Sequence, residues 1–254
     1  MTITINKTYL FFGLLSVLAV LYAGNIFGIN KIINLLVDKP VKLSFLIVSP
    51  DKEQCEKCFD AKKVVSLIKS SHNIKISGNK IVKKGDFLYD KLLNQYALKN
   101  LPAVIVSGDI SDERILGSWK SFDGEKKDEA IVIQNLLPFY DIASGEEKGL
   151  IDIILLKDAS CTDCFDEGEY IKMITRGGMV VKNLKVYDIS SQKGADIVKQ
   201  YKITKVPTII LSSDAGDYPG FEKSWKGVGT KEDDGRFVLR EVEKTTNGLK
   251  FKTI

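Results

Sequence analysis

Residues 43–59, LSFLIVSPDKEQCEKCF, place an apolar run of strand length a few residues before a Cys-x-x-Cys pair. Residues 151–165, IDIILLKDASCTDCF, have the same arrangement. The first cysteines of the two pairs, Cys55 and Cys161, are 106 positions apart, and a phenylalanine follows the second cysteine of each pair. Self-similarity at a distance of this size is typical of a duplicated structural unit, and it is a stronger signal than either cysteine pair alone.

The segments that follow each pair recur in the same order. In the first half, hydrophobic spacing predicts a helix, a short strand, an amphipathic stretch and a further strand: 61–68, 73–76, 87–98 and 104–106. In the second half it predicts the same series: 165–174, 179–186, 195–201 and 209–211. A proline precedes the last strand of each series, Pro102 at 47 residues after Cys55 and Pro207 at 46 residues after Cys161. Alternating strands and helices indicate an α/β unit with a central sheet in each half.

These features together resemble the thioredoxin fold, in which a strand leads to a Cys-x-x-Cys pair that opens a helix. Val206-Pro207-Thr208 is similar to the cis-proline element of that family, and Leu101-Pro102-Ala103 is a looser version of it. Two such units in tandem resemble protein disulfide oxidoreductases built from paired thioredoxin-like domains. The resemblance implies an α/β fold class with two tandem thioredoxin-like domains, each a central mixed sheet flanked by helices.

The repeat suggests where the domains begin and end. We expect six segments: a short N-terminal tail (1–8), a membrane helix (9–30), a first domain (41–137), a linker (138–149), a second domain (150–245) and a C-terminal tail (246–254). The linker is assigned because its sequence, PFYDIASGEEKG, is polar and rich in turn-forming residues. The tail shows no recognisable pattern.

The N-terminal segment is long and apolar enough to cross a membrane. No charged residue occurs from Thr8 to Asn30, and about 20 apolar residues suffice for a transmembrane helix. We therefore expect 9–30 to be a single membrane anchor in contact with lipid. A cleaved signal peptide and a buried helix are the alternatives, although Leu21 stands where a cleavage site requires a small residue.

The side of the membrane is less clear from the sequence. Lys31, Lys39 and Lys42 follow the segment, which weakly favours a cytoplasmic position for the rest of the chain. Disulfide chemistry favours the opposite side, because disulfides persist outside the cytoplasm. We expect the soluble domains to be extracytoplasmic.

The cysteines carry the expected chemistry. A cysteine at the start of a helix faces unpaired backbone N–H groups and the positive end of the helix dipole, and both favour the thiolate. Cys-x-x-Cys cysteines in that setting have pKa values of roughly 3.5–7, against about 8.5 for a free thiol. We therefore expect Cys55 and Cys161 to be nucleophiles, and Cys58 and Cys164 to resolve the mixed disulfides.

The two motifs also depart from the family pattern. Neither contains Gly-Pro between its cysteines, and no acidic residue stands at the strand position that assists proton transfer in thioredoxins; Ser49 and Leu155 lie at about that spacing. Between the cysteines, Lys57 favours a thiolate whereas Asp163 opposes one. The hypothesis that follows is a lower pKa for Cys55 than for Cys161, with Cys55/Cys58 the more oxidising pair.

The resemblance also implies a polypeptide-binding edge beside each pair. In the thioredoxin fold the cis-proline loop presents backbone to an extended substrate, so Leu101 with Pro102, and Val206 with Pro207, are expected to bind substrate. The expected partners are protein thiols or disulfides and an unidentified redox partner. No cofactor is expected beyond the redox-active disulfides themselves.

Composition and spacing weigh against other classes. The 254-residue chain has a formal net charge of +4 that is spread along it, so nucleic acid is not an expected partner. Cys58 and Cys161 are 103 positions apart, which disfavours a shared zinc ion or iron–sulfur cluster, since zinc ribbons usually separate their pairs by about 15–20 residues. The expected function is thiol–disulfide exchange with proteins. The alternative is a redox-inert, membrane-tethered polypeptide-binding module with structural disulfides.

Overall fold

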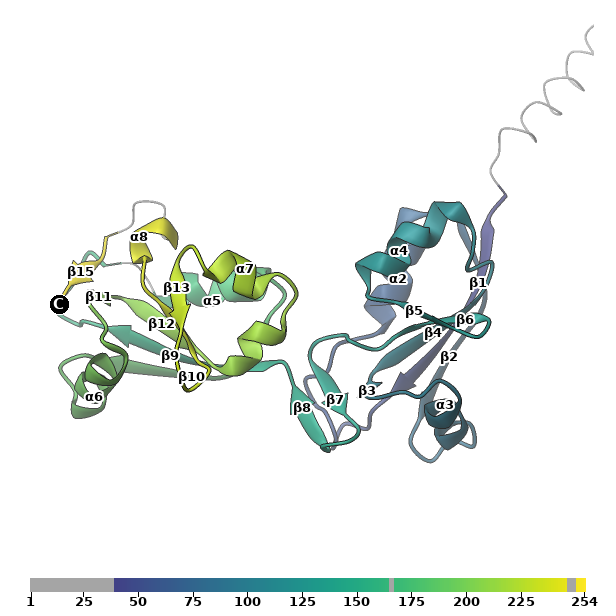
Figure 1. Ribbon diagram of the computed structural model, residues 1–254, viewed down its shortest axis with the longest axis horizontal. Coiled ribbons are helices and arrows are strands. Elements are labelled where there is room, and N and C mark those ends of the chain that lie inside the picture. Colours follow the sequence, from purple (N-terminus) through teal and green to yellow (C-terminus); the bar gives the residue numbers. More distant parts are fainter. Residues whose placement is uncertain (1–38, 165–166, 246–249) are drawn as a thin grey trace, which may run out of the picture.

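The computed structural model describes residues 39–164, 167–245 and 250–254. Within these residues, each half of the sequence forms its own five-stranded sheet with helices packed against it (Figure 1). Two smaller sheets, one of three strands and one of two, stand beside the large ones. The mixed α/β organisation expected from the sequence is confirmed.

The first large sheet has the strand order β2-β1-β4-β6-β5. Its strands are β1 (Val41–Ser49), β2 (Ile74–Lys83), β4 (Ala103–Gly108), β5 (Glu125–Lys127) and β6 (Ala130–Ile133). Strands β1 and β2 are parallel, and the other neighbours are antiparallel, so the sheet is mixed. The hairpin of β5 and β6 was not anticipated from the sequence, and β2 is longer than the short strand expected over 73–76.

Helices cover both faces of this sheet, which explains the continuous apolar run of β1. They are α2 (Lys62–Ser71), α3 (Tyr89–Gln95) and α4 (Leu116–Ser121), the last preceded by the 3-10 turn η1 (Glu113–Ile115). Leu43, Phe45 and Ile47 pack with buried residues of α2 and α4. Val48 and Ile105 pack with buried residues of α3 on the opposite face. Because successive strand residues point to opposite faces, a strand covered on both sides is apolar at nearly every position.

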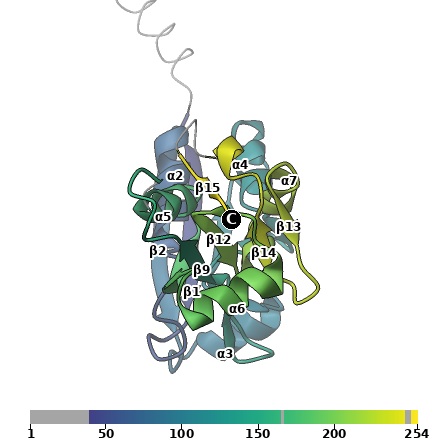
Figure 2. The same cartoon turned by 90° about the vertical axis from the view of Figure 1, so that its left-hand side faces the viewer.

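The second half repeats this plan with the strand order β10-β9-β12-β14-β13. Its strands are β9 (Leu150–Lys157), β10 (Val180–Asp188), β12 (Thr208–Leu211), β13 (Gly229–Lys231) and β14 (Phe237–Leu239). Its helical elements are α5 (Glu167–Arg176), α6 (Gln192–Tyr201), η2 (Ser213–Asp217), α7 (Phe221–Trp225) and α8 (Val242–Thr245). Figures 1 and 2 show α6 on one side of the sheet and α5 and α7 on the other, and the two buried clusters divide in the same way.

Residues 138–149, expected to be an irregular linker, contain a β-hairpin. Its strands are β7 (Phe139–Asp141) and β8 (Glu146–Lys148), and β7 pairs with β3 (Asn100–Leu101), directly before Pro102. The polar sequence reflects a hairpin with little buried surface, and Gly145, with φ of 71°, serves its turn. The partner strand lies about 40 residues earlier in the chain, so no local pattern indicated the pairing.

The expected tail, 246–254, also contains structure in the part that is described. Strand β15 (Lys252–Thr253) pairs antiparallel with β11 (Lys205–Val206), directly before Pro207. Strands β15 and β7 therefore hold equivalent positions in the repeat. Each adds a strand to the segment that leads into a proline.

The expected membrane helix, 9–30, lies outside the described residues. Among the residues that are described, no helix combines the length and the apolar character needed to span a bilayer.

Candidate functional site

Both Cys-x-x-Cys pairs are closed as disulfides, Cys55–Cys58 and Cys161–Cys164, each with a Cα–Cα distance of 5.4 Å. We call the first disulfide with strand β3 site 1, and the second disulfide with strand β11 site 2. Each pair follows the central parallel strand of its sheet, β1 or β9. The two sites therefore occupy the same place in the two repeats.

The first pair does not open its helix, which corrects the sequence-based expectation for site 1. Helix α2 begins at Lys62, four residues after Cys58. The first cysteine of each pair instead closes a turn, with the N–H groups of Cys55 and Cys161 donating to the Asp51 and Asp158 carbonyls at 3.0 Å. The first-turn N–H groups of α2 are therefore several residues away in sequence, and the argument for thiolate stabilisation by a helix N-terminus is weakened at site 1.

The second cysteine of each pair lies against the backbone that precedes the proline. Cys58 Sγ is 3.6 Å from the carbonyl oxygen of Leu101, and Cys164 Sγ is 4.0 Å from that of Val206. The Leu101–Pro102 and Val206–Pro207 peptide bonds are both cis. The structure thus brings together all eight residues singled out in the sequence, four at each site, although their roles in exchange stay predictions.

The sulfur atoms differ in accessibility between the sites. Cys55 is buried, at 6% exposure, whereas Cys58, Cys161 and Cys164 are half-buried. A groove of about 280 Å³ reaches both cysteines of site 1, and its lining includes the Lys52 side chain. At site 1 the cysteine expected to attack is therefore less exposed than the cysteine expected to resolve.

The backbone edges expected to bind substrate are occupied by the chain itself. At site 1, Leu101 pairs with Tyr140 of β7. At site 2, Val206 pairs with Lys252 of β15. An extended substrate that used the same edge would first have to displace the resident strand, because one strand edge accepts one partner.

The hairpin of β7 and β8 also contacts the turn that carries the first disulfide. The Phe59 N–H donates to the Pro138 carbonyl at 2.8 Å, and the Glu56 N–H donates to Glu147 Oε1 at 3.1 Å. Lys57 Nζ donates to the Val181 carbonyl at 3.2 Å, which joins site 1 to strand β10 of the second half. The sequence motif is thus held by residues from the expected linker and from the other repeat.

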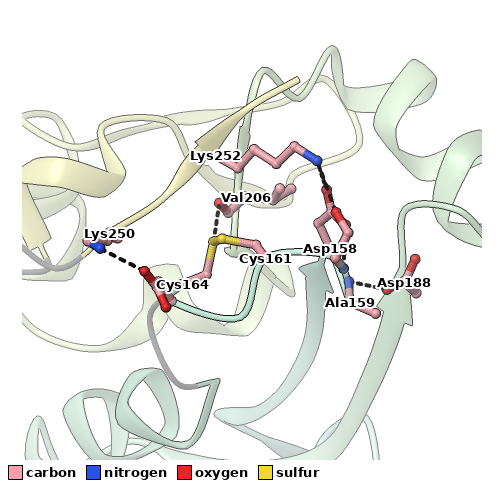
Figure 3. Close-up of a disulfide and its surroundings, with 10 residues drawn as sticks. Asp158, Ala159, Cys161, Cys164, Asp188, Val206, Lys250 and Lys252 are labelled. Atoms are coloured by element: carbon pink, nitrogen blue, oxygen red, sulfur yellow. Dashed lines mark hydrogen bonds and ion pairs between the residues drawn. A yellow bond between two sulfur atoms is a disulfide. The ribbon is translucent and has the colours of Figure 1, made fainter.

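Two lysines hold β15 beside the second disulfide (Figure 3). Lys250 Nζ lies 2.8 Å from Asp163 Oδ2, and Lys252 Nζ contacts Asp158 Oδ2. Hydrogen bonds from Lys252 and Ser160 lower the pKa of Asp158 to about 2. Asp158 is therefore an anion throughout the physiological range.

These contacts bear on the hypothesis that Cys55 has the lower thiol pKa and that Cys55/Cys58 is the more oxidising pair. Lys57 is directed to a backbone carbonyl, and the Asp163 charge is paired with Lys250. Asp163 therefore opposes a Cys161 thiolate less than its sequence position suggests. The lower pKa of Cys55 stays a prediction with weaker support.

The strand position that carries an acid in thioredoxins supplies none here. Ser49 ends β1, and Leu155 is completely buried in β9. Apart from buried tyrosines and Trp119, Gln134 and Thr208 are the buried polar side chains among the described residues, and neither of these two is ionisable. The described residues also include no group of three or more His, Cys, Asp or Glu side chains that could hold a metal ion.

The sequence did not reveal the residues that hold the resident strands beside β3 and β11, chiefly Glu147, Asp158, Lys250 and Lys252. A signal for the second edge was present, because charged and apolar residues alternate in Lys250-Phe251-Lys252, as in a half-buried strand. Phe251 packs against the second core as that alternation requires. No comparable signal marks Glu147.

Comparison with known proteins adds little to this geometry. No protein-family model matches the chain, and no curated protein matches it. Among solved structures, the chain is similar to the NTD_N/C domain of alkylhydroperoxide reductase AhpF from Enterococcus faecalis (V583), at 15% sequence identity. The match covers 72% of this chain and 87% of that one, with a TM-score of 0.20, which supports no inference about function. The repeated element order and the two Cys-x-x-Cys disulfides are therefore the observations on which an argument about function must rest.

Proposed function

We propose that the protein exchanges disulfides with cysteine-containing polypeptides at both sites. The observation that carries the proposal is the pair of equivalent disulfides, each in a turn at the end of a central strand and each with at least one half-buried cysteine. Structural disulfides need no such accessibility. Disulfides that take part in exchange must be reached by a thiolate.

The chemistry balances without a further cofactor. A substrate thiolate attacks one sulfur of the pair, which forms a mixed disulfide and releases the other cysteine as a thiolate. A second substrate thiolate then attacks the substrate sulfur of the mixed disulfide. The substrate leaves as a disulfide, and the protein retains two electrons and two protons as a dithiol. The same steps in reverse reduce a substrate.

Access decides which sulfur is attacked. At site 1 the half-buried Cys58 is more accessible than the buried Cys55, so an incoming thiolate meets Cys58 and releases Cys55. At site 2 both cysteines are half-buried, and Cys164 Sγ lies 4.0 Å from the Val206 carbonyl oxygen, so burial alone does not single out the sulfur that is attacked. In the reducing direction the same steps run in reverse, so at site 1 Cys58 attacks the substrate disulfide and Cys55 resolves it, opposite to the roles expected from the sequence. At site 2 Cys161 remains the expected nucleophile.

We further propose that residues 9–30 anchor both domains to a membrane on its extracytoplasmic side. The support is the uncharged apolar run of that segment and the persistence of disulfides outside the cytoplasm. Protease protection of the full chain in sealed vesicles tests the anchor and its orientation together.

Insulin reduction and the refolding of a reduced, unfolded protein test the exchange activity in both directions. We expect turnover by the unmutated chain, and its loss when all four cysteines are replaced by serine. The absence of turnover in both assays would exclude the proposal.

A redox-inert polypeptide-binding module is the second candidate, because one observation favours it. Cys55 is 6% exposed, and an occupied strand edge lies beside it, as expected of a disulfide that only stabilises a turn. Peptide binding without any disulfide transfer would support this candidate.

A further inference from the structure

Residues 250–254 lie along site 2 as a bound extended peptide would. Thr253 pairs with Lys205, Lys252 pairs with Val206, and the Ile254 N–H donates to the Thr204 carbonyl at 2.9 Å. Upstream, Lys250 forms a parallel β-bridge with Cys164. The segment therefore contacts both the proline strand and the disulfide turn, the two parts of the site.

The side chains of the segment alternate between charge recognition and packing. Lys250 and Lys252, two residues apart, form ion pairs with Asp163 and Asp158. Lys252 also donates to Ser160 Oγ at 3.1 Å. The intervening Phe251 packs against the second core. Alternate residues of a strand point to opposite faces. The two lysines therefore contact the carboxylates of Asp163 and Asp158, and Phe251 contacts the apolar core on the other side.

We propose that segment 250–254 is an intramolecular stand-in for the substrate of site 2, and that site 2 acts on extended polypeptides of the same basic, alternating type. The inference rests on the proposed exchange function. The resident segment occupies the edge and two carboxylates until a polypeptide of matching chemistry replaces it. Backbone pairing supplies affinity in such strand addition, and the alternate side chains supply specificity.

The contacts of the segment suit a replaceable occupant. Strand β15 is two residues long, and the Lys250–Asp163 pair is exposed on both sides, at 71% and 67%. Exposed ion pairs contribute little and are screened by salt. Only Asp158 is well covered, at 9% side-chain exposure, so Lys252 is the main charge contact of the segment.

The resident strand of site 1 is less easily replaced than that of site 2. Its resident strand β7 is continuous with β8 through three paired positions, and the hairpin makes two further hydrogen bonds to the disulfide turn. Displacing β7 would require opening all of these contacts. Site 1 is therefore the internal control for any experiment on site 2.

Charge reversal of the resident lysines tests the replacement step. In the full chain, Lys250→Glu with Lys252→Glu places like charges against Asp158 and Asp163, and we expect reduction of Cys161–Cys164 by dithiothreitol to accelerate by up to about tenfold, the range of two ion pairs. Ile254→Pro, which removes the N–H donated to Thr204, should give a smaller increase. Lys193→Glu on α6 is the matched control. Alkylation followed by mass spectrometry reports each disulfide separately, and the rate at Cys55–Cys58 should stay unchanged.

Peptides test the recognition chemistry without any disulfide transfer. The probes are Gly-Lys-Phe-Lys-Thr-Ile and its acidic counterpart Gly-Glu-Phe-Glu-Thr-Ile, titrated into the oxidised Ile254→Pro protein by NMR. We expect the basic peptide to shift the amides of β11 and of the 158–164 turn, and to bind at least fivefold more tightly than the acidic one.

The outcomes separate the two levels of the proposal. Equal site 2 rates in all variants, or equal binding of the two peptides, would overturn the stand-in role even if the protein transfers disulfides. Loss of disulfide transfer to any protein substrate, with selective binding of the basic peptide retained, would overturn the exchange function and leave a binding site for basic strands.

Discussion

In each half of the molecule a short strand covers the backbone edge beside the disulfide, but the two strands are held by different numbers of contacts. Each half must satisfy a backbone edge beside a disulfide, and each does so with a strand that follows its large sheet, β7 or β15. Strand β7 belongs to a hairpin that also bonds to the first disulfide turn, whereas β15 has two paired residues and two lysine contacts. The comparison teaches that duplication can preserve a strand position while its energetic role diverges.

Removing the cysteines of one site at a time is the strongest way to break this comparison. We expect Cys55→Ser with Cys58→Ser to abolish exchange at site 1, and Cys161→Ser with Cys164→Ser to abolish it at site 2, because serine forms no disulfide. Insulin reduction by each double variant, compared with the unmutated chain, measures the share of each site. Complete loss of activity in each double variant would show that the sites act in series rather than separately.

Cavities in the separate cores test whether the halves are independent. Phe45 is 1% exposed in the core of the first half, and Phe237 is 1% exposed in that of the second. We expect Phe45→Ala to lower the free energy of unfolding of the first half by about 3–5 kcal/mol, the usual cost of removing a buried aromatic ring. Denaturant titration with alkylation of each reduced pair measures the two halves separately. Phe237→Ala is the matched variant, and it should affect the second pair alone.

The hairpin contact at site 1 provides a smaller effect. Glu147→Gln keeps a side-chain oxygen for the Glu56 N–H at 3.1 Å, whereas Glu147→Ala removes it. A hydrogen bond to a charged group contributes about 1.5–3 kcal/mol at most, and less at an exposed site. We expect Glu147→Ala to accelerate reduction of Cys55–Cys58 a few-fold, with Glu147→Gln close to the unmutated protein. An unchanged rate in the alanine variant would mean that the hairpin does not restrict access to site 1.

Acid should weaken the docking of β15 beside site 2. Hydrogen bonds from Lys252 and Ser160 lower the folded-state pKa of Asp158 to about 2, from an ordinary value of 3.8. A lowered pKa stabilises the docked state above the ordinary value, and that contribution is lost as the pH falls from about 4 to about 2. NMR of the Lys252 amide across this range measures the effect. In Asp158→Asn the same transition should disappear.

Much of the fold and of the candidate site followed from local sequence patterns. The apolar runs of β1 and β9 predicted strands, and the structure explains why they are apolar at nearly every position, because helices cover both faces of each sheet. The resemblance to the thioredoxin fold implied that each Cys-x-x-Cys pair lies beside a proline strand, and the structure has both pairs in that arrangement.

The remaining features depended on contacts between distant parts of the chain. After the turn at Cys55, helix α2 begins only at Lys62. The hairpin at 139–148 has a polar sequence that is typical of a loop. Short strands such as β7 bury little surface of their own, so their sequences show little periodicity, and the alternation that marks β15 spans only three residues, 250–252. Their pairing comes from backbone groups that the proline strands leave open.

The duplication, the alternation of strands and helices and the two Cys-x-x-Cys pairs could be predicted from the sequence, because each depends on the spacing of residues that lie close together in the chain. The accessibility of the four cysteine sulfur atoms, in contrast, is visible only in the tertiary structure. Burial of Cys55, the hairpin over site 1 and the lysines that hold β15 over site 2 arise from residues 39 or more positions apart in the chain. Backbone hydrogen bonding is indifferent to side-chain identity, so such pairings leave almost no trace in the sequence.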